Sequence, residues 1–318
     1  MSGSRGAAGV AFSTLALLAW PGSLLADDGT AAAPVAATPG SLVLAWIPVI
    51  SYVLTPVILF ILWRTRFWRP PLDRPTPWRL SAGVSFALFA LSIVGGGIVA
   101  SLVAGMVAQA GIVDTNLRLA IGTWGGVLGG LLGAAPGWVI ATQEPRPAEA
   151  PPPMPFGTAV LAGLSGLAIA LPPVEAAASL GQAIQQAISG REPDPLAHDT
   201  LQALMATTPD LGWWLVVAGA LIGAPVLEEI LYRGFLQQGM RRLGVGPWLA
   251  TLATAGLFAL MHLPALPIEG RISALSGLLV LAIGLGILRE RTGRLAPCIL
   301  AHALFNALNL LLALTATG

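Results

Sequence analysis

The chain has 318 residues, of which 55% are hydrophobic and 10% are charged, and its net charge is +1. A soluble domain carries about 25% charged residues, so this composition excludes an ordinary soluble protein and indicates an integral membrane protein. The near-neutral balance gives no sign of a nucleic-acid partner. The single cysteine, Cys298, excludes an intrachain disulfide and a cysteine-based metal site.

The N-terminal segment, residues 1–26, has one arginine, an apolar core and then small residues. This pattern resembles a signal peptide, and an uncleaved first membrane helix is the alternative reading. A polar linker rich in alanine and proline follows at 27–40.

Beyond the linker, apolar runs of about 20 residues recur, which is the length that a membrane-spanning helix needs. We therefore expect an all-α, polytopic membrane bundle of about eight transmembrane helices. The expected spans are 41–63, 81–110, 117–142, 156–180, 211–232, 248–264, 272–288 and 296–315. Residues 27–155 hold the linker and three of these helices, and 156–318 hold the core in which the polar motifs lie.

Two features of the early spans predict local structure. Glycine is frequent between residues 83 and 140, and small residues let membrane helices approach closely, so we expect helix packing there. Pro172 and Pro173 interrupt the fourth span, where we expect them to kink or end the helix near the outer face.

Arginines concentrate in alternate loops, at 64–79, 143–155, 233–247 and 289–295. Because cytoplasmic loops attract arginine, we expect these loops to face the cytosol and 111–118, 181–210 and 265–271 to face outward. The longest outer segment, 181–210, has room for a short interfacial helix. The pattern predicts a multi-pass protein of the plasma membrane, such as a bacterial inner membrane.

Polar motifs interrupt three of the last four spans. The first is Glu228-Glu229-x-x-x-Arg233 within APVLEEILYRGFLQ, the second is Phe258-x-x-x-His262, and the third is His302-x-x-x-Asn306. An ionisable group at membrane depth costs about 2.5–3.5 kcal/mol unless it is paired or faces a polar cavity. Glu229 and Arg233 share a helix face and can pair. Glu228 is rotated by about 100°, so its candidate partners are His262 and His302.

This set of side chains suits peptide hydrolysis. A carboxylate with a histidine can hold and deprotonate water, and a second donor pair can stabilise the developing oxyanion. Glu228 with His262 would activate water, and His302 with Asn306 would form the oxyanion hole. Glu229 and Arg233 would orient the site, and Phe258 is expected to line its wall.

The three motifs, in this order and each on its own helix, resemble the CPBP family. That family includes type 2 CAAX prenyl proteases, bacteriocin-processing membrane endopeptidases and lysostaphin-resistance-type proteins. The resemblance covers about residues 211–314, with GLGILRERTGRLAPCILAHALFN as supporting context. It implies an intramembrane glutamic endopeptidase without a cofactor, acting on CAAX-like or other membrane-associated peptides. It also implies the same roles for Glu228, His262, His302 and Asn306, and a more structural role for Glu229 with Arg233.

Two other classes of protein remain open. Glu228, His262 and His302 could bind zinc as in a metalloprotease, although the chain has no HExxH motif. A non-catalytic scaffold or a transporter could also carry a polar cluster at mid-membrane depth. The expected partners are membrane lipid and a peptide or lipidated-protein substrate, and no nucleic acid.

The expected topology raises a difficulty of depth. Glu228 would lie near the cytosolic end of the span 211–232, whereas His262 would lie near the opposite end of 248–264. The mismatch eases if 248–264 starts deeper or tilts, or if 233–247 is partly helical and buried. Because His302 lies early in its helix, we expect the site to open toward the cytosolic leaflet.

Overall fold

The computed structural model describes residues 39–66, 80–143, 154–190 and 199–317, and within these ranges it is helical without a β-strand. Eight helices of this part of the chain are long and apolar enough to cross a membrane. The predicted all-α bundle of eight spans is therefore confirmed. The signal-peptide-like segment 1–26 and most of the linker lie outside the described residues, and the domain division at 155 stays a prediction.

The first half of the described chain consists of long single helices. They are α1 (Pro39–Arg64), α2 (Ala82–Gln109), α3 (Thr115–Gln143) and α4 (Phe156–Ser189). Helix α4 continues through Pro172 and Pro173, so these prolines do not end the helix, and the alternative expectation of a kink stays a prediction. The short helix expected within 181–210 is present as α5 (Asp199–Met205), although 181–189 belong to α4.

The second half holds a composite span followed by three helices. The span comprises α6 (Leu211–Ala218), a π-helical segment Gly219–Gly223, α7 (Ala224–Glu228), a second π-helical segment Glu229–Leu236, and α8 (Gln237–Arg242). It is followed by α9 (Pro247–Met261), with short 3₁₀ turns at Leu263–Ala265 and Ile268–Gly270, and then by α10 (Arg271–Thr292) and α11 (Ala296–Thr317).

The composite span corrects the predicted boundary at residue 232. It runs without a break from Leu211 to Arg242, so Arg233 is a buried helical residue and not part of a surface loop. Glu228 lies roughly 25 Å from Leu211 and roughly 21 Å from Arg242 at 1.5 Å per residue. Glu228 thus lies midway along its span and not near its cytosolic end. His262 directly follows the last residue of α9, and the two side chains line the same cavity, which resolves the mismatch in depth.

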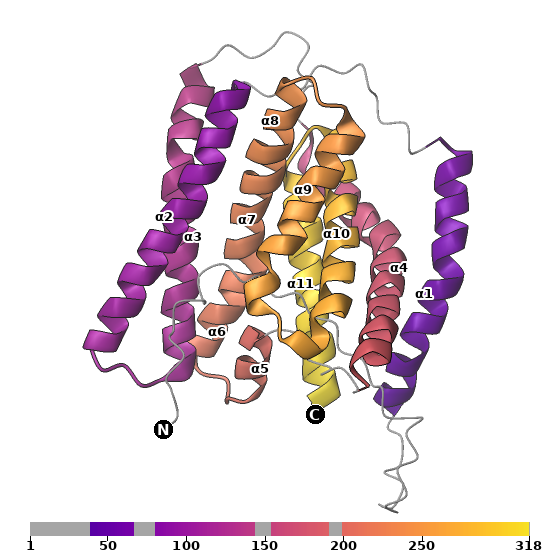
Figure 1. Ribbon diagram of the computed structural model, residues 1–318, viewed down its shortest axis with the longest axis horizontal. Coiled ribbons are helices and arrows are strands. Elements are labelled where there is room, and N and C mark those ends of the chain that lie inside the picture. The colour runs from indigo at the N-terminus through magenta and orange to yellow at the C-terminus, as the bar shows by residue number, and fades with distance from the viewer. Residues whose placement is uncertain (1–38, 67–79, 144–153, 191–198, 318) are drawn as a thin grey trace, which may run out of the picture.

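Figure 1 shows α6, α7 and α8 as a central column with α9, α10 and α11 beside it. Helices α2 and α3 flank this group on one side, and α4 and then α1 flank it on the other. The ends of α1, α3, α8 and α10 lie on one side of the bundle, which agrees with the predicted alternation of loops.

Glycines allow α2 and α3 to pack backbone against backbone. A Cβ on Gly129 would lie 2.5 Å from the Gly95 carbonyl oxygen, and one on Gly133 would lie 2.6 Å from the Leu91 carbonyl oxygen. Side chains at these positions would force the helices apart. The packing role predicted for the glycines is confirmed at these positions.

The start of the composite span is fixed by a polar cap. Asp210 Oδ1 accepts a hydrogen bond from the Trp213 backbone N–H at 2.7 Å, as an N-cap residue does. The same oxygen accepts one from the Asn116 side-chain amide at 3.1 Å. The cap thus joins α6 to the start of α3, and it sets the register at which Glu228 and Glu229 enter the bundle.

Candidate active site

The innermost part of the site is an ion-pair chain centred on Glu229. Arg233 Nη1 lies 2.7 Å from Glu229 Oε1, and His302 Nδ1 lies 2.9 Å from the same oxygen. Glu229 and Arg233 have no exposed surface, and His302 is 2% exposed. Because a carboxylate accepts, His302 donates through Nδ1, so its Nε2 is the nitrogen turned toward Glu228.

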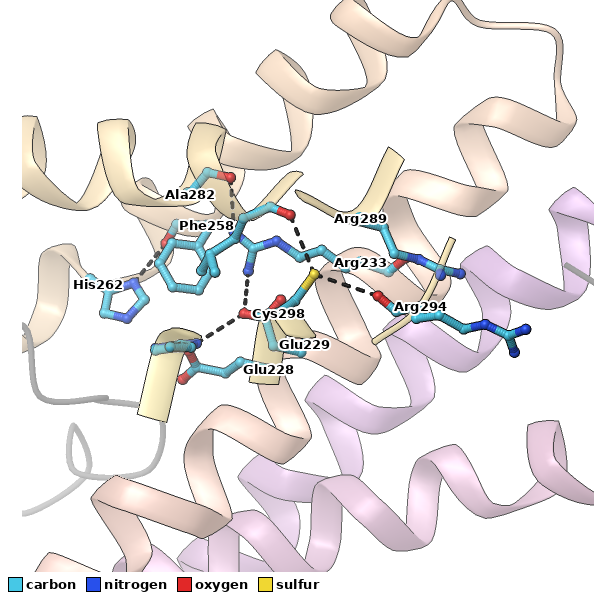
Figure 2. Close-up of polar contacts among 11 residues, drawn as sticks. Glu228, Glu229, Arg233, Phe258, His262, Ala282, Arg289, Arg294 and Cys298 are labelled. Atoms are coloured by element: carbon cyan, nitrogen blue, oxygen red, sulfur yellow. Dashed lines mark hydrogen bonds and ion pairs between the residues drawn. The ribbon is translucent and has the colours of Figure 1, made fainter. Parts of the chain in front are cut away.

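Arg233 is held by further contacts (Figure 2). Its Nη2 donates to the Ala282 carbonyl on α10 at 3.1 Å, and its guanidinium lies 4.8 Å from the centre of the Phe258 ring. The backbone carbonyl of Arg233 accepts from Arg289 Nε at 3.3 Å. A planar guanidinium with several donors can make such contacts at once, which explains how a cation is accommodated at this depth.

Glu228 faces the other way, as the 100° rotation between neighbouring helix residues requires. Its Oε2 lies 3.9 Å from His302 Nε2, and its side chain is 10% exposed. This separation is too long for a direct hydrogen bond and is of the kind that a water molecule bridges. Glu228 therefore stands next to His302 without being locked to it.

His262 lies at the end of α9, where its Nδ1 donates to the Phe258 carbonyl at 2.6 Å. In the neutral ring this bond leaves Nε2 as the acceptor nitrogen. The Phe258 ring lies 4.7 Å from the His262 ring and 5.8 Å from the His302 ring, centre to centre. Phe258 thus packs against both histidines, but it is not among the residues that line the cavity beside Glu228.

A small cavity lies beside Glu228 and His262. It is lined by both of these residues and by Ile93, Leu227, Leu231, Tyr232 and Met261. The volume open to the centre of a water molecule is about 10 Å³, which is about the space that one water needs. The carboxylate of Glu228 and the ring of His262 therefore share one small, mostly apolar chamber.

Asn306 lies on the far side of His302, one turn further along α11. Its Nδ2 donates to the Ala220 carbonyl at 2.9 Å. This carbonyl is in the first π-helical segment, where the Ala224 backbone N–H donates to Gly219 instead and Pro225 has no N–H to offer. Asn306 therefore supplies the hydrogen-bond donor that the helix backbone cannot offer to Ala220. It is not among the residues that line the cavity.

The π-helical segments and a second polar layer were not predicted from the sequence. Gln237, one turn beyond Arg233, donates through Nε2 to Thr251, Gly286 and Glu290 at 3.3, 3.1 and 2.9 Å. This layer joins α8, α9 and α10 beside the ion-pair chain. Pro225 inside an apolar span is the signal that could have indicated the first π-helical segment, because proline removes a helix donor.

The three candidate zinc ligands, Glu228, His262 and His302, all lie within the described residues. No group of three or more His, Cys, Asp or Glu side chains in the described chain has an arrangement that could hold a metal ion. The Nδ1 bond of His262 to the Phe258 carbonyl leaves its Nε2 as an acceptor, so this bond does not decide between the zinc and the glutamic mechanism.

Comparison with known proteins gives one match. Residues 210–308 match the family model described as type II CAAX prenyl endopeptidase Rce1-like. Comparisons with curated proteins and with solved structures return no match. The matched segment runs from the Asp210 cap to α11 and contains all the polar motifs of the site.

Proposed function

We propose that the chain is an intramembrane glutamic endopeptidase of the type II CAAX prenyl endopeptidase (Rce1-like) family, whose model its residues 210–308 match. The substrate would be a membrane-associated or lipidated peptide with a CAAX-like end. The observation that carries the proposal is the chamber with room for about one water between Glu228 and His262.

In the proposed reaction Glu228 acts as the general base. Its carboxylate takes a proton from water while the water oxygen bonds to the scissile carbonyl carbon, and the carbonyl electrons move to oxygen. When the tetrahedral intermediate collapses, the C=O bond re-forms, the C–N bond breaks, and the leaving nitrogen takes the proton from Glu228. His262 would hold the water by accepting its second hydrogen. Proton transfer by a positioned group contributes about 10²–10⁴-fold.

The remaining residues position this pair and receive the developing charge. Glu229 orients His302 through the 2.9 Å contact with Nδ1, and Arg233 neutralises Glu229. His302 and Asn306 are the proposed oxyanion donors, as the family resemblance implies. His302 turns Nε2 toward Glu228 and would donate from that nitrogen as an imidazolium, because Nδ1 already donates to Glu229. Asn306 already donates one amide hydrogen to Ala220.

The protein is a multi-pass membrane protein, and we propose that it lies in the plasma membrane with the site accessible from the cytosolic leaflet. The support is that α8 ends in Arg241 and Arg242 and α10 ends with Arg289 and Arg291, on the same side of the bundle. Excess arginine marks the cytoplasmic side of a membrane protein.

The test is cleavage by the purified full-length chain in lipid nanodiscs. A quenched fluorescent peptide with a prenylated CAAX end is compared with the same peptide without the prenyl group. The wild type is expected to release the last three residues, and Glu228→Gln is expected to abolish release. Glu175→Gln is the matched control, because Glu175 is a half-buried carboxylate of α4 away from the chamber.

Equal cleavage by the wild type and Glu228→Gln would contradict the proposal. A chelator distinguishes the glutamic mechanism from the zinc alternative: retained activity supports the former, and loss of activity that zinc restores supports the latter. A chain that cleaves neither peptide would favour the scaffold or transporter reading.

A further inference from the structure

Tyr232 is a polar residue of the chamber to which the proposed mechanism gives no role. Among the residues that line the chamber, it alone carries a hydroxyl group. It follows Glu228 by four residues, which places the two side chains on the same face of the span, and both line the chamber. The chamber therefore contains an acceptor, an imidazole and a hydroxyl donor within one mostly apolar wall.

The ring of Tyr232 is held in place by aromatic neighbours. It lies edge-on to Phe258 at 5.0 Å and to Phe89 at 5.6 Å, with interplanar angles of 76° and 74°. Its residue is 5% exposed. Such edge-to-face contacts favour one orientation of the ring, so the direction of the hydroxyl is set by packing before a substrate enters.

Buried tyrosine hydroxyls usually find a hydrogen-bond partner. Within the described chain, no hydrogen bond joins the Tyr232 hydroxyl to another residue. The donors proposed from the sequence are differently placed: His302 donates to Glu229, Asn306 donates to Ala220, and neither lines the chamber. The hydroxyl of a ring that is held in place and belongs to a lining residue of the chamber is thus well suited to meet a group that arrives with the substrate.

We propose that Tyr232 is a further catalytic residue, whose hydroxyl donates a hydrogen bond to the carbonyl oxygen of the scissile bond as that oxygen becomes negative. The inference rests on the proposed endopeptidase function. Tyr232 transfers no proton in this step: the O–H bond stays intact, and Glu228 carries the proton from water to the leaving nitrogen. A preorganised donor of this kind acts more strongly on the transition state than on the substrate.

Tyr232→Phe tests the proposal, because it removes the hydroxyl and keeps the ring contacts with Phe258 and Phe89. The variant is expected to lower kcat for the prenylated peptide about 100-fold, with KM changed less than threefold. Tyr52→Phe is the matched control, since Tyr52 is the only other tyrosine of the chain and is exposed on α1. The melting temperature of each variant is measured on the same samples.

A binding measurement makes the test independent of turnover. A peptide phosphonate, which mimics the tetrahedral oxyanion, is compared with a non-cleavable peptide of the same side chains. Tyr232→Phe is expected to weaken phosphonate binding about tenfold or more and to leave binding of the non-cleavable peptide unchanged.

The outcomes separate this inference from the proposed function. If Glu228→Gln is inactive while Tyr232→Phe keeps the wild-type kcat, the role of Tyr232 is wrong and the endopeptidase function stands. If Glu228→Gln remains active, the proposed function itself fails. Equal weakening of both ligands by Tyr232→Phe would show a structural effect and overturn the inference.

Discussion

Glu228 and Glu229 are adjacent in the chain and lie at the same depth, yet their surroundings differ. Glu229 is fully buried and has close contacts with both Arg233 and His302, at 2.7 and 2.9 Å. Glu228 faces the chamber, and its contact with His302 is 3.9 Å. One carboxylate is held by charged partners (Figure 2), and the other borders a space of about one water.

The difference shows how two adjacent residues of one helix can have different roles. A carboxylate that is fully paired at close range is a poor base, because taking up a proton would break its ion pairs. A carboxylate beside a small chamber can exchange a proton with water. The rotation of about 100° per residue thus separates a supporting half of the site, around Glu229, from a reacting half, around Glu228.

The largest expected effects come from replacing each glutamate by glutamine. Glu229→Gln leaves Arg233 as a buried cation without its anion, so the free energy of unfolding is expected to fall by about 3–5 kcal/mol. Glu228→Gln is expected to keep that free energy within about 1 kcal/mol of the wild type while cleavage falls about 1,000-fold or more. The free energy of unfolding is measured by SDS titration in mixed micelles, followed by tryptophan fluorescence.

Measured side by side, the two variants test whether Glu228 and Glu229 have different roles. If Glu228→Gln destabilises the protein as strongly as Glu229→Gln, both carboxylates are structural and the division into two halves is wrong. Glu175→Gln serves again as the control for the loss of a membrane-depth carboxylate outside the site.

A smaller effect is expected from Arg233→Lys within the supporting half. A lysine ammonium can reach Glu229 but cannot also make the contacts with the Ala282 carbonyl and the Phe258 ring. The loss of one hydrogen bond from a charged donor is expected to cost about 1.5–3 kcal/mol in unfolding free energy. Arg242→Lys, on an exposed arginine, is the control and is expected to stay within about 0.5 kcal/mol.

Asn306→Ala is expected to cost less, about 1–2 kcal/mol, because it orphans the Ala220 carbonyl, one acceptor of the π-helical segment. Asn309→Ala is a matched control from the same helix, since Asn309 bonds to the Phe305 carbonyl of its own preceding turn. If both variants unfold with the same free energy, Asn306 does not support the π-helical segment. The kcat of Asn306→Ala, measured on the same sample, tests its proposed oxyanion role.

The features that the sequence predicted well depend on local spacing. The eight spans follow from apolar runs of membrane length, and the contact of Glu229 with Arg233 follows from their separation by four residues. The approach of Glu228 to His302 followed from the cost of leaving a charge unpaired in a membrane. Each of these rests on one helix or on one rule of burial.

The features that were missed depend on contacts between helices. Arg233 looked like the first charge beyond the membrane, and only its partners on other helices allow the span to continue to Arg242. The first π-helical segment needs the amide of Asn306, which lies 86 residues away from Ala220 in sequence. The sequence alone does not single out Tyr232, because packing decides which side chains share a chamber.

The smallest expected effect comes from a change that narrows the chamber beside Glu228 and leaves the contacts of Glu229 intact. A Cβ on Gly130 of α3 would lie 2.7 Å from Leu227 Cδ2, the end of a flexible side chain that lines the chamber. Gly130→Ala should push Leu227 into a space of about one water and lower kcat about threefold, with the unfolding free energy changed by less than about 1.5 kcal/mol. Gly97→Ala, where a Cβ meets nothing within 4 Å, should leave kcat unchanged. A drop in stability without a drop in kcat would show that Leu227 yields away from the chamber, and that the volume beside Glu228 does not limit the reaction.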